Sequence, residues 1–220
     1  MAQNWDKWIG AQRQQETVLQ PWPVHALDSV LDQPAVRDVE RLPPLWHWLY
    51  FLETAPQHRI GMDGHPEKGD FLPPVPNPRR MFAGSRSQYF KPLIVSLPTQ
   101  LTETVQSVSE KSGGLFLVTV NYQYCQENEL CVEEQRDFIY LPEATTGSSA
   151  NILEQRDEPL EEYPWSLDVS ADPTRLMRFS ALTFNSHRIH YDVDYARDVE
   201  GYPGLVVHGP LTAMLLLELS

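Results

Sequence analysis

Cysteine, basic residues and long hydrophobic runs are all scarce in this chain of 220 residues. The two cysteines, Cys125 and Cys131, have no partners at the spacings of a zinc site. We expect reduced thiols and no metal, although a single disulfide between them stays open. The 17 lysines and arginines are outnumbered by 30 acidic residues, which gives a net charge of −13. That charge excludes a chain-wide basic footprint for nucleic acid and disfavours an anionic membrane surface.

No apolar run approaches the roughly 18–20 residues that span a bilayer. The N-terminus also lacks the basic segment and apolar stretch of a secretory signal, so we expect a cytoplasmic protein. With 41% hydrophobic and 21% charged residues, the composition is that of an ordinary globular protein. The length suffices for one large domain or two small ones.

The first third of the chain predicts helices and one long loop. We expect a polar helix at 4–18, a second helix at 24–31 and a buried aromatic helix at 42–53, with prolines at its start. Several of the 19 prolines fall within 57–78. Proline lacks a backbone donor, so this segment is interpreted as an irregular loop, and loops of that length are usually functional.

A run of strand signals follows. Alternating and β-branched residues predict strands at 80–90, 99–110, 115–124 and 130–141, with turns at 111–114 and 126–129. One buried helix followed by an antiparallel meander is an α+β unit with a sheet around the helix. Residues 142–164 are polar and predict a linker. Beyond it we expect a strand at 177–184 and a helix at 210–219.

The most specific chemical signal is a polar cluster that follows the apolar run 177–184. It holds Asn185, His187, His190 and Asp192, and a second signal, His208-Gly209-Pro210, opens the last helix. An imidazole and a carboxamide at the end of an element, with free backbone N–H groups of a helix start nearby, are able to activate water and hold an oxyanion.

These motifs resemble those of the MaoC-like, hot-dog-fold (R)-specific enoyl-thioester hydratases. Asn185 stands five residues before His190, where that family has an aspartate, and the His190-x-Asp192 tail matches as well. The segments 42–52, 69–84 and 132–135 are similar to the N-terminal half of double-hot-dog dehydratases. That group includes the hydroxyacyl-thioester dehydratases type 2, the mesaconyl-C4-CoA hydratases and the itaconyl-CoA hydratases.

The resemblance implies an α+β, hot-dog fold with two hot-dog units in tandem, the second incomplete in this chain. The expected division is an N-terminal hot-dog domain at 1–141, a linker at 142–164 and a C-terminal MaoC-like domain at 165–220 that carries the catalytic motif.

The resemblance also implies roles for three residues. His190 is the expected general acid/base, since an imidazole exchanges protons at neutral pH. Asn185 is expected to orient the attacking water, because an amide cannot shuttle protons. The N–H of Gly209, at the helix start, is expected to hold the thioester oxygen. The alternatives are a histidine that caps the loop, a turn asparagine and a glycine needed for close packing.

Four further residues are hypotheses for substrate binding. Arg79, Arg80 and Arg86 lie beside the proline-rich loop and suit the phosphates of a CoA carrier, or they are ordinary surface arginines. His208 is either a substrate contact or a structural residue.

The expected activity is reversible addition of water to an enoyl-CoA, with a short branched or dicarboxylic acyl group such as itaconyl or mesaconyl-C4. The alternatives are a 3-hydroxyacyl-ACP dehydratase of fatty-acid synthesis, a hot-dog thioesterase and a non-catalytic acyl-thioester-binding subunit. We expect an acyl-CoA substrate, no cofactor other than the CoA of the substrate, no nucleic-acid or membrane partner, and a homodimer.

Overall fold

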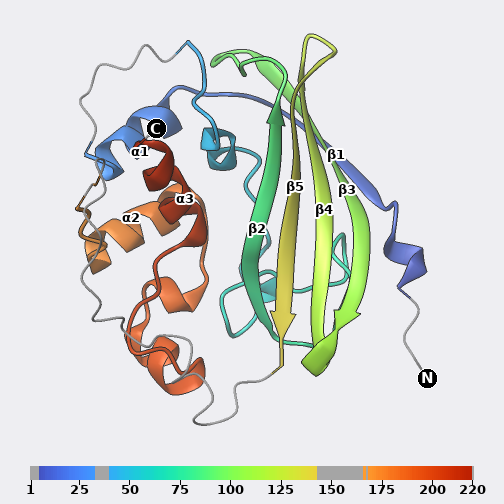
Figure 1. The fold of residues 1–220 in the computed structure, drawn as a ribbon, viewed down its shortest axis with the longest axis vertical. Coiled ribbons are helices and arrows are strands. Elements are labelled where there is room, and N and C mark those ends of the chain that lie inside the picture. Colours follow the sequence, from blue (N-terminus) through green and yellow to red (C-terminus); the bar gives the residue numbers. More distant parts are fainter. Residues whose placement is uncertain (1–4, 33–39, 143–165, 167, 220) are drawn as a thin grey trace.

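The computed structural model describes residues 5–32, 40–142, 166 and 168–219. In Figure 1 an antiparallel sheet forms one layer, and the helices lie together on one side of it. The strand order is β1-β3-β4-β5-β2. The strands are β1 (Gln12–Val18), β2 (Arg79–Tyr89), β3 (Pro98–Lys111), β4 (Leu115–Gln126) and β5 (Glu129–Leu141), and the α-helices are α1 (Trp22–Val30), α2 (Pro173–Leu182) and α3 (Gly209–Leu217). The predicted α+β class is confirmed.

The four strands and two turns predicted between residues 80 and 141 are confirmed to within a few residues. Val118 and Val120 on β4 are fully buried and face the helices, because alternate residues of a strand point to the same side. The β4–β5 turn has Glu127 and Asn128 at φ of 50° and 64°, the left-handed pair that suits a two-residue hairpin. We call the face of the sheet toward the helices its inner face.

The helix expected at 4–18 is wrong for its second half, which is the edge strand β1. Its side chains alternate between exposed and half-buried along Gln12–Val18. Gln12 Nε2 donates to Thr104 Oγ1 of β3 at 3.0 Å, so polar pairs across the strands support this polar element. Because this strand has few apolar residues, its sequence lacks the alternation of apolar and polar residues that predicts a strand.

The buried helix expected at 42–53 is also wrong, because only one 3₁₀ turn, Trp46–Leu49, forms there. Leu45 and Phe51 on either side have φ of 67° and 55°, which no helix continues through. The side chains are nevertheless buried as expected. The irregular backbone aims His47 and Trp48 at the same buried carboxylate, Glu134, which a regular helix would not do.

The strand expected at 177–184 is instead α2. Asp172 caps this helix, since its Oδ1 accepts from Thr174 N at 2.8 Å, and Pro173 takes the first helical position. This Asp-Pro start is the signal that the apolar run concealed. The last helix, expected at 210–219, is confirmed as α3.

The C-terminal helices share one hydrophobic core with the sheet. Leu176 and Phe179 of α2 and Leu211 and Met214 of α3 are buried in the cluster that contains the inner-face side chains. The linker predicted at 142–164 lies, from residue 143, outside the described residues, and the domain boundaries remain a prediction. Within the described part of the chain no helix has the length and hydropathy to cross a bilayer.

Candidate active site

A cavity of about 330 Å³ lies between the inner face of the sheet and the segment that follows α2. Its lining brings together Asn185, His190 and Gly209, the three residues predicted to be catalytic. The opposite wall carries residues from the strands and from the loop at 57–78. Polar groups from distant parts of the sequence therefore meet in a single space.

Asn185 shapes the loop that carries the polar motif. Its backbone N–H donates to Ser180 O at 2.8 Å, and its Oδ1 accepts from the backbone N–H of His187 at 3.0 Å. This is an Asx turn, which confirms the turn role considered from the sequence, while the catalytic role stays a prediction. The carboxamide oxygen is used by the loop. The Nδ2 group has no acceptor among the described residues and remains for a ligand in the cavity.

His190 is held as a neutral base. Its Nδ1 lies 2.7 Å from Val206 O, and because a carbonyl only accepts, Nδ1 carries the proton and Nε2 the lone pair. The residue is 7% exposed. Burial lowers the pKa of His190 to about 4, so the imidazole is uncharged at neutral pH.

His208 lies behind His190, outside the cavity lining. The two rings stack with centroids 3.6 Å apart, and His208 Nε2 is 2.8 Å from Ser180 Oγ. Burial, with the nearby His190, lowers the pKa of His208 to about 3. This geometry supports a structural role, in which His208 fixes the plane of the His190 ring.

Gly209 is the first residue of α3 and is followed by Pro210. Within the described residues its N–H has no acceptor, as is usual for the first turn of a helix, and the helix dipole places partial positive charge there. A Cβ at this position would come 3.2 Å from the ring of Phe82. The absence of a side chain therefore lets the ring of Phe82 pack closely against this helix start.

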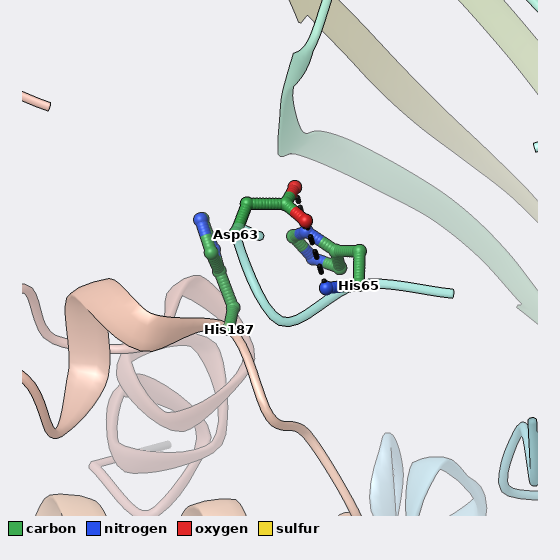
Figure 2. Close-up of side chains that lie close together, drawn as sticks. All are labelled: Asp63, His65 and His187. Atoms are coloured by element: carbon green, nitrogen blue, oxygen red, sulfur yellow. Dashed lines mark hydrogen bonds and ion pairs between the residues drawn. The ribbon is translucent and has the colours of Figure 1, made fainter. Parts of the chain in front are cut away.

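The loop at 57–78 contributes Asp63 and His65, which the sequence did not single out. Figure 2 shows both beside His187, with the carboxylate bonded to His65. His65 Nδ1 is 2.9 Å from Asp63 Oδ2, and its backbone N–H donates to Asp63 Oδ1 at 3.0 Å. The Asp63-Gly-His65 sequence within a loop expected to be functional was the available signal.

This group of side chains has the composition of a metal site. Ligand atoms of Asp63, His65 and His187 lie within 4.8 Å of one another, and His187 Nε2 is buried without a partner in the described part of the chain. Both oxygens of Asp63, however, already accept hydrogen bonds from His65. The carboxylate thus orients an imidazole, in the way that second-shell carboxylates do.

Charged residues on the inner face of the sheet form the far wall of the cavity. Arg13 Nη2 donates to Glu103 Oε1 at 2.9 Å, across β1 and β3. On β5, Arg136 Nη2 donates to Glu134 Oε2 at 2.8 Å, and the same oxygen lies 2.8 Å from His47 Nε2. Glu103 falls at an inward position between apolar residues of a predicted strand, and this was the signal in the sequence.

The structure separates the three arginines predicted to bind CoA. Arg80 lines the cavity. Arg79 forms an ion pair with the buried Glu200, and Arg86 lies 2.7 Å from Asp137 on the outer face. The β2–β5 register shifts by one residue between Phe82 and Gly84. This bulge turns Arg86 away from the side that Arg80 faces.

Comparisons with known proteins agree with this geometry. The family model for hydroxyacyl-thioester dehydratase type 2 matches residues 45–220. The mesaconyl-C(4)-CoA hydratase of Chloroflexus aurantiacus is 44% identical over 99% of this chain and 78% of its own length. The mitochondrial hydroxyacyl-thioester dehydratase type 2 of Schizosaccharomyces pombe is 26% identical over 82% and 67%. The chain belongs to the hydroxyacyl-thioester dehydratase type 2 family, as the resemblance implied.

Solved structures show the same fold at low sequence identity. HtdX of Mycobacterium tuberculosis has a TM-score of 0.63 at 16% identity, and the match covers 93% of this chain and 75% of that one. A MaoC-like dehydratase from Phytophthora capsici has a TM-score of 0.64 at 13% identity, with coverage of 96% and 75%. The predicted MaoC-like hot-dog fold is thereby confirmed.

Proposed function

We propose that this chain is a hydro-lyase that reversibly adds water to the double bond of an enoyl-CoA thioester. The observation that carries the proposal is the meeting of His190 and Gly209 in one cavity. The first is a neutral imidazole with its proton anchored on Nδ1, and the second is a helix-start N–H without an acceptor among the described residues. Membership of the family and the hydratase relative at 44% identity support the same reaction.

The geometry supports a mechanism with one base. Nε2 of His190 takes a proton from water as the water oxygen bonds to the β-carbon, and the π electrons move toward the thioester. The Gly209 N–H donates to the thioester oxygen, where negative charge develops. The imidazolium then returns the proton to the α-carbon. The Asx turn uses only Oδ1 of Asn185, so Nδ2 is available to donate to the substrate or to the attacking water. Dehydration is the reverse sequence.

The acyl group that we propose is short, and branched or dicarboxylic. The far wall of the cavity bears arginine and glutamate side chains among its apolar residues, so a charged group of the acyl chain has polar partners there. The similarity to a mesaconyl-C(4)-CoA hydratase points to the same class. The name of the Schizosaccharomyces pombe relative keeps open a hydroxyacyl thioester on another carrier, including ACP.

The oligomeric state and the compartment remain predictions. We propose a homodimer in the cytoplasm, while the Schizosaccharomyces pombe relative is named as mitochondrial. We propose no cofactor beyond the CoA of the substrate.

His190→Ala tests the mechanism directly. Loss of a general acid/base typically lowers a rate by about 10²–10⁴-fold, so we expect kcat/KM for hydration to fall by that amount. The measurement is the loss of enoyl-thioester absorbance, with a thiol reagent present to detect hydrolysis. His58→Ala is the matched control, because His58 is exposed and outside the cavity lining. Activity of His190→Ala within a few-fold of wild type would remove His190 from the mechanism.

A further inference from the structure

Arg80 stands out among the charged residues that line the cavity. Its side chain is 17% exposed, and its guanidinium packs 4.6 Å above the ring of Phe138. It makes no hydrogen bond to the described residues, and its partner in an ion pair is Glu53 at 3.9 Å. The Glu53 side chain is itself 40% exposed and open to solvent. A mostly buried guanidinium with unused hydrogen-bond donors costs free energy, because protein partners do not replace the water that it has lost.

The other two arginines of the cavity are neutralised by the protein. Arg13 is bonded to Glu103 through two of its nitrogens, and Glu103 is almost fully buried. Arg136 is bonded to Glu134 and to the hydroxyl of Tyr124. Each of these cations therefore has a buried carboxylate of its own. Arg80 does not, and its donors are left for a ligand.

Arg80 belongs to the same space as the reacting end of the cavity. It pairs with Tyr140 in the β2–β5 register and projects from the inner face of the sheet, toward the motif loop. Burial lowers the pKa of His187, and the charge of Arg80 contributes in the same direction. The guanidinium is thus within electrostatic reach of the motif loop that also carries His190.

We propose that Arg80 binds a free carboxylate on the acyl chain of the substrate, and that this contact selects enoyl thioesters of dicarboxylic acids. The inference rests on the proposed function and adds the residue that reads the acyl group. An arginine fork matches a carboxylate through two parallel hydrogen bonds, which are strong in a partly desolvated site. A substrate with a methyl group in place of the carboxylate leaves the guanidinium uncompensated, so it is rejected.

Two pairs of compounds separate this role from a contact with the phosphates of CoA. Mesaconyl-C4-CoA and 3-methylcrotonyl-CoA differ by a carboxylate in place of a methyl group, and so do their saturated counterparts, methylsuccinyl-C4-CoA and isovaleryl-CoA. All four share the CoA portion. A contact with CoA affects both members of a pair equally, whereas a contact with the acyl carboxylate affects only one.

The first experiment measures kcat/KM for the two unsaturated compounds with wild type, Arg80→Gln, Arg80→Lys and the control Arg86→Gln. For Arg80→Gln we expect a loss of about 10- to 100-fold with mesaconyl-C4-CoA, the size of a lost hydrogen bond to a charged group, and little change with 3-methylcrotonyl-CoA. Arg80→Lys keeps the charge and should recover part of the loss. Arg86→Gln should behave as wild type, because Arg86 lies outside the cavity lining.

The second experiment measures binding of the saturated pair by calorimetry and needs no turnover. The subsite is supported if wild type prefers methylsuccinyl-C4-CoA and Arg80→Gln loses this preference. This conclusion holds even if no hydration is detected, and in that case only the proposed function fails. Equal weakening of both compounds, or no preference in wild type, overturns the carboxylate subsite. Should Arg80→Gln not fold, as circular dichroism would show, Arg80→Lys decides by the same criterion.

Discussion

At the scale of single residues, one side chain of the site combines an observed role in the fold with a proposed role in the chemistry. Asn185 gives its oxygen to the backbone N–H of His187, a bond that sets the course of the motif loop toward His190. Its nitrogen is the part that remains for the reaction. The hydrogen bond confirms the turn interpretation, and the free nitrogen leaves room for the catalytic role that we propose.

Replacing Asn185 tests this division of labour. Asn185→Asp retains an oxygen at the same position, so we expect its stability to stay close to that of wild type. Asn185→Ala leaves the His187 N–H without its acceptor and should lower the free energy of unfolding by about 1 kcal/mol. Urea denaturation of both variants provides the measurement. Equal stabilities of the two variants would show that the Asx turn does not hold the loop.

At the scale of elements, the site depends on how the loop at 57–78 meets the motif loop. Ser186 Oγ donates to Gly64 O at 2.5 Å, and the backbone N–H of Arg188 donates to Asp63 O at 2.9 Å. These contacts hold His65 beside His187, with ring centroids 4.2 Å apart. Two irregular segments thus stabilise each other without regular secondary structure.

Gly64→Ala should separate these two segments. Gly64 has φ of +92°, and a Cβ there would lie 1.8 Å from Ser186 O, so the backbone must move. We expect a strong loss of hydration activity with the sheet intact by circular dichroism. Gly10→Ala is the matched control, since Gly10 also has a positive φ of +85° but nothing within 4 Å of the added carbon. Wild-type activity in Gly64→Ala would show that the loop contact is dispensable.

At the scale of the whole molecule, folding keeps histidines in and behind the cavity neutral. Burial lowers the pKa of His190 to about 4 and that of His208 to about 3. The unfolded chain takes up protons on the same residues near the ordinary value of about 6.5. Between these pH values the unfolded state therefore binds more protons than the folded state, so protonation favours unfolding there.

Stability should consequently fall as the pH decreases. The stabilisation linked to the lowered histidine pKa values is fully present above pH about 6.5. It is lost progressively as the pH falls toward 4, because the unfolded state binds more protons there. Between pH 7.5 and pH 5 we expect a decrease of about 2 kcal/mol for each of these two histidines. Urea unfolding at several pH values measures it. A flat profile in wild type would contradict the buried, neutral assignment.

The sequence by itself determined four of the five strands, the family and the residues of the polar motif. Alternating residues within 80–141 specify strands because a strand exposes successive side chains to opposite faces. The order of Asn185, His190 and Gly209 was enough to predict that they share a site, and the structure places all three in one cavity lining. Each of these inferences depends on short-range spacing, which is fully visible in a sequence.

Only the tertiary structure decided the remainder. The run at 177–184 became a helix because α2 packs its apolar face into a core shared with the sheet. Of the three arginines predicted to bind CoA, Arg80 alone lines the cavity, because a one-residue bulge in β2 turns Arg86 outward. His65 entered the site through contacts with residues more than 120 positions away in the chain. Such outcomes depend on packing between distant segments, and local sequence patterns do not encode them individually.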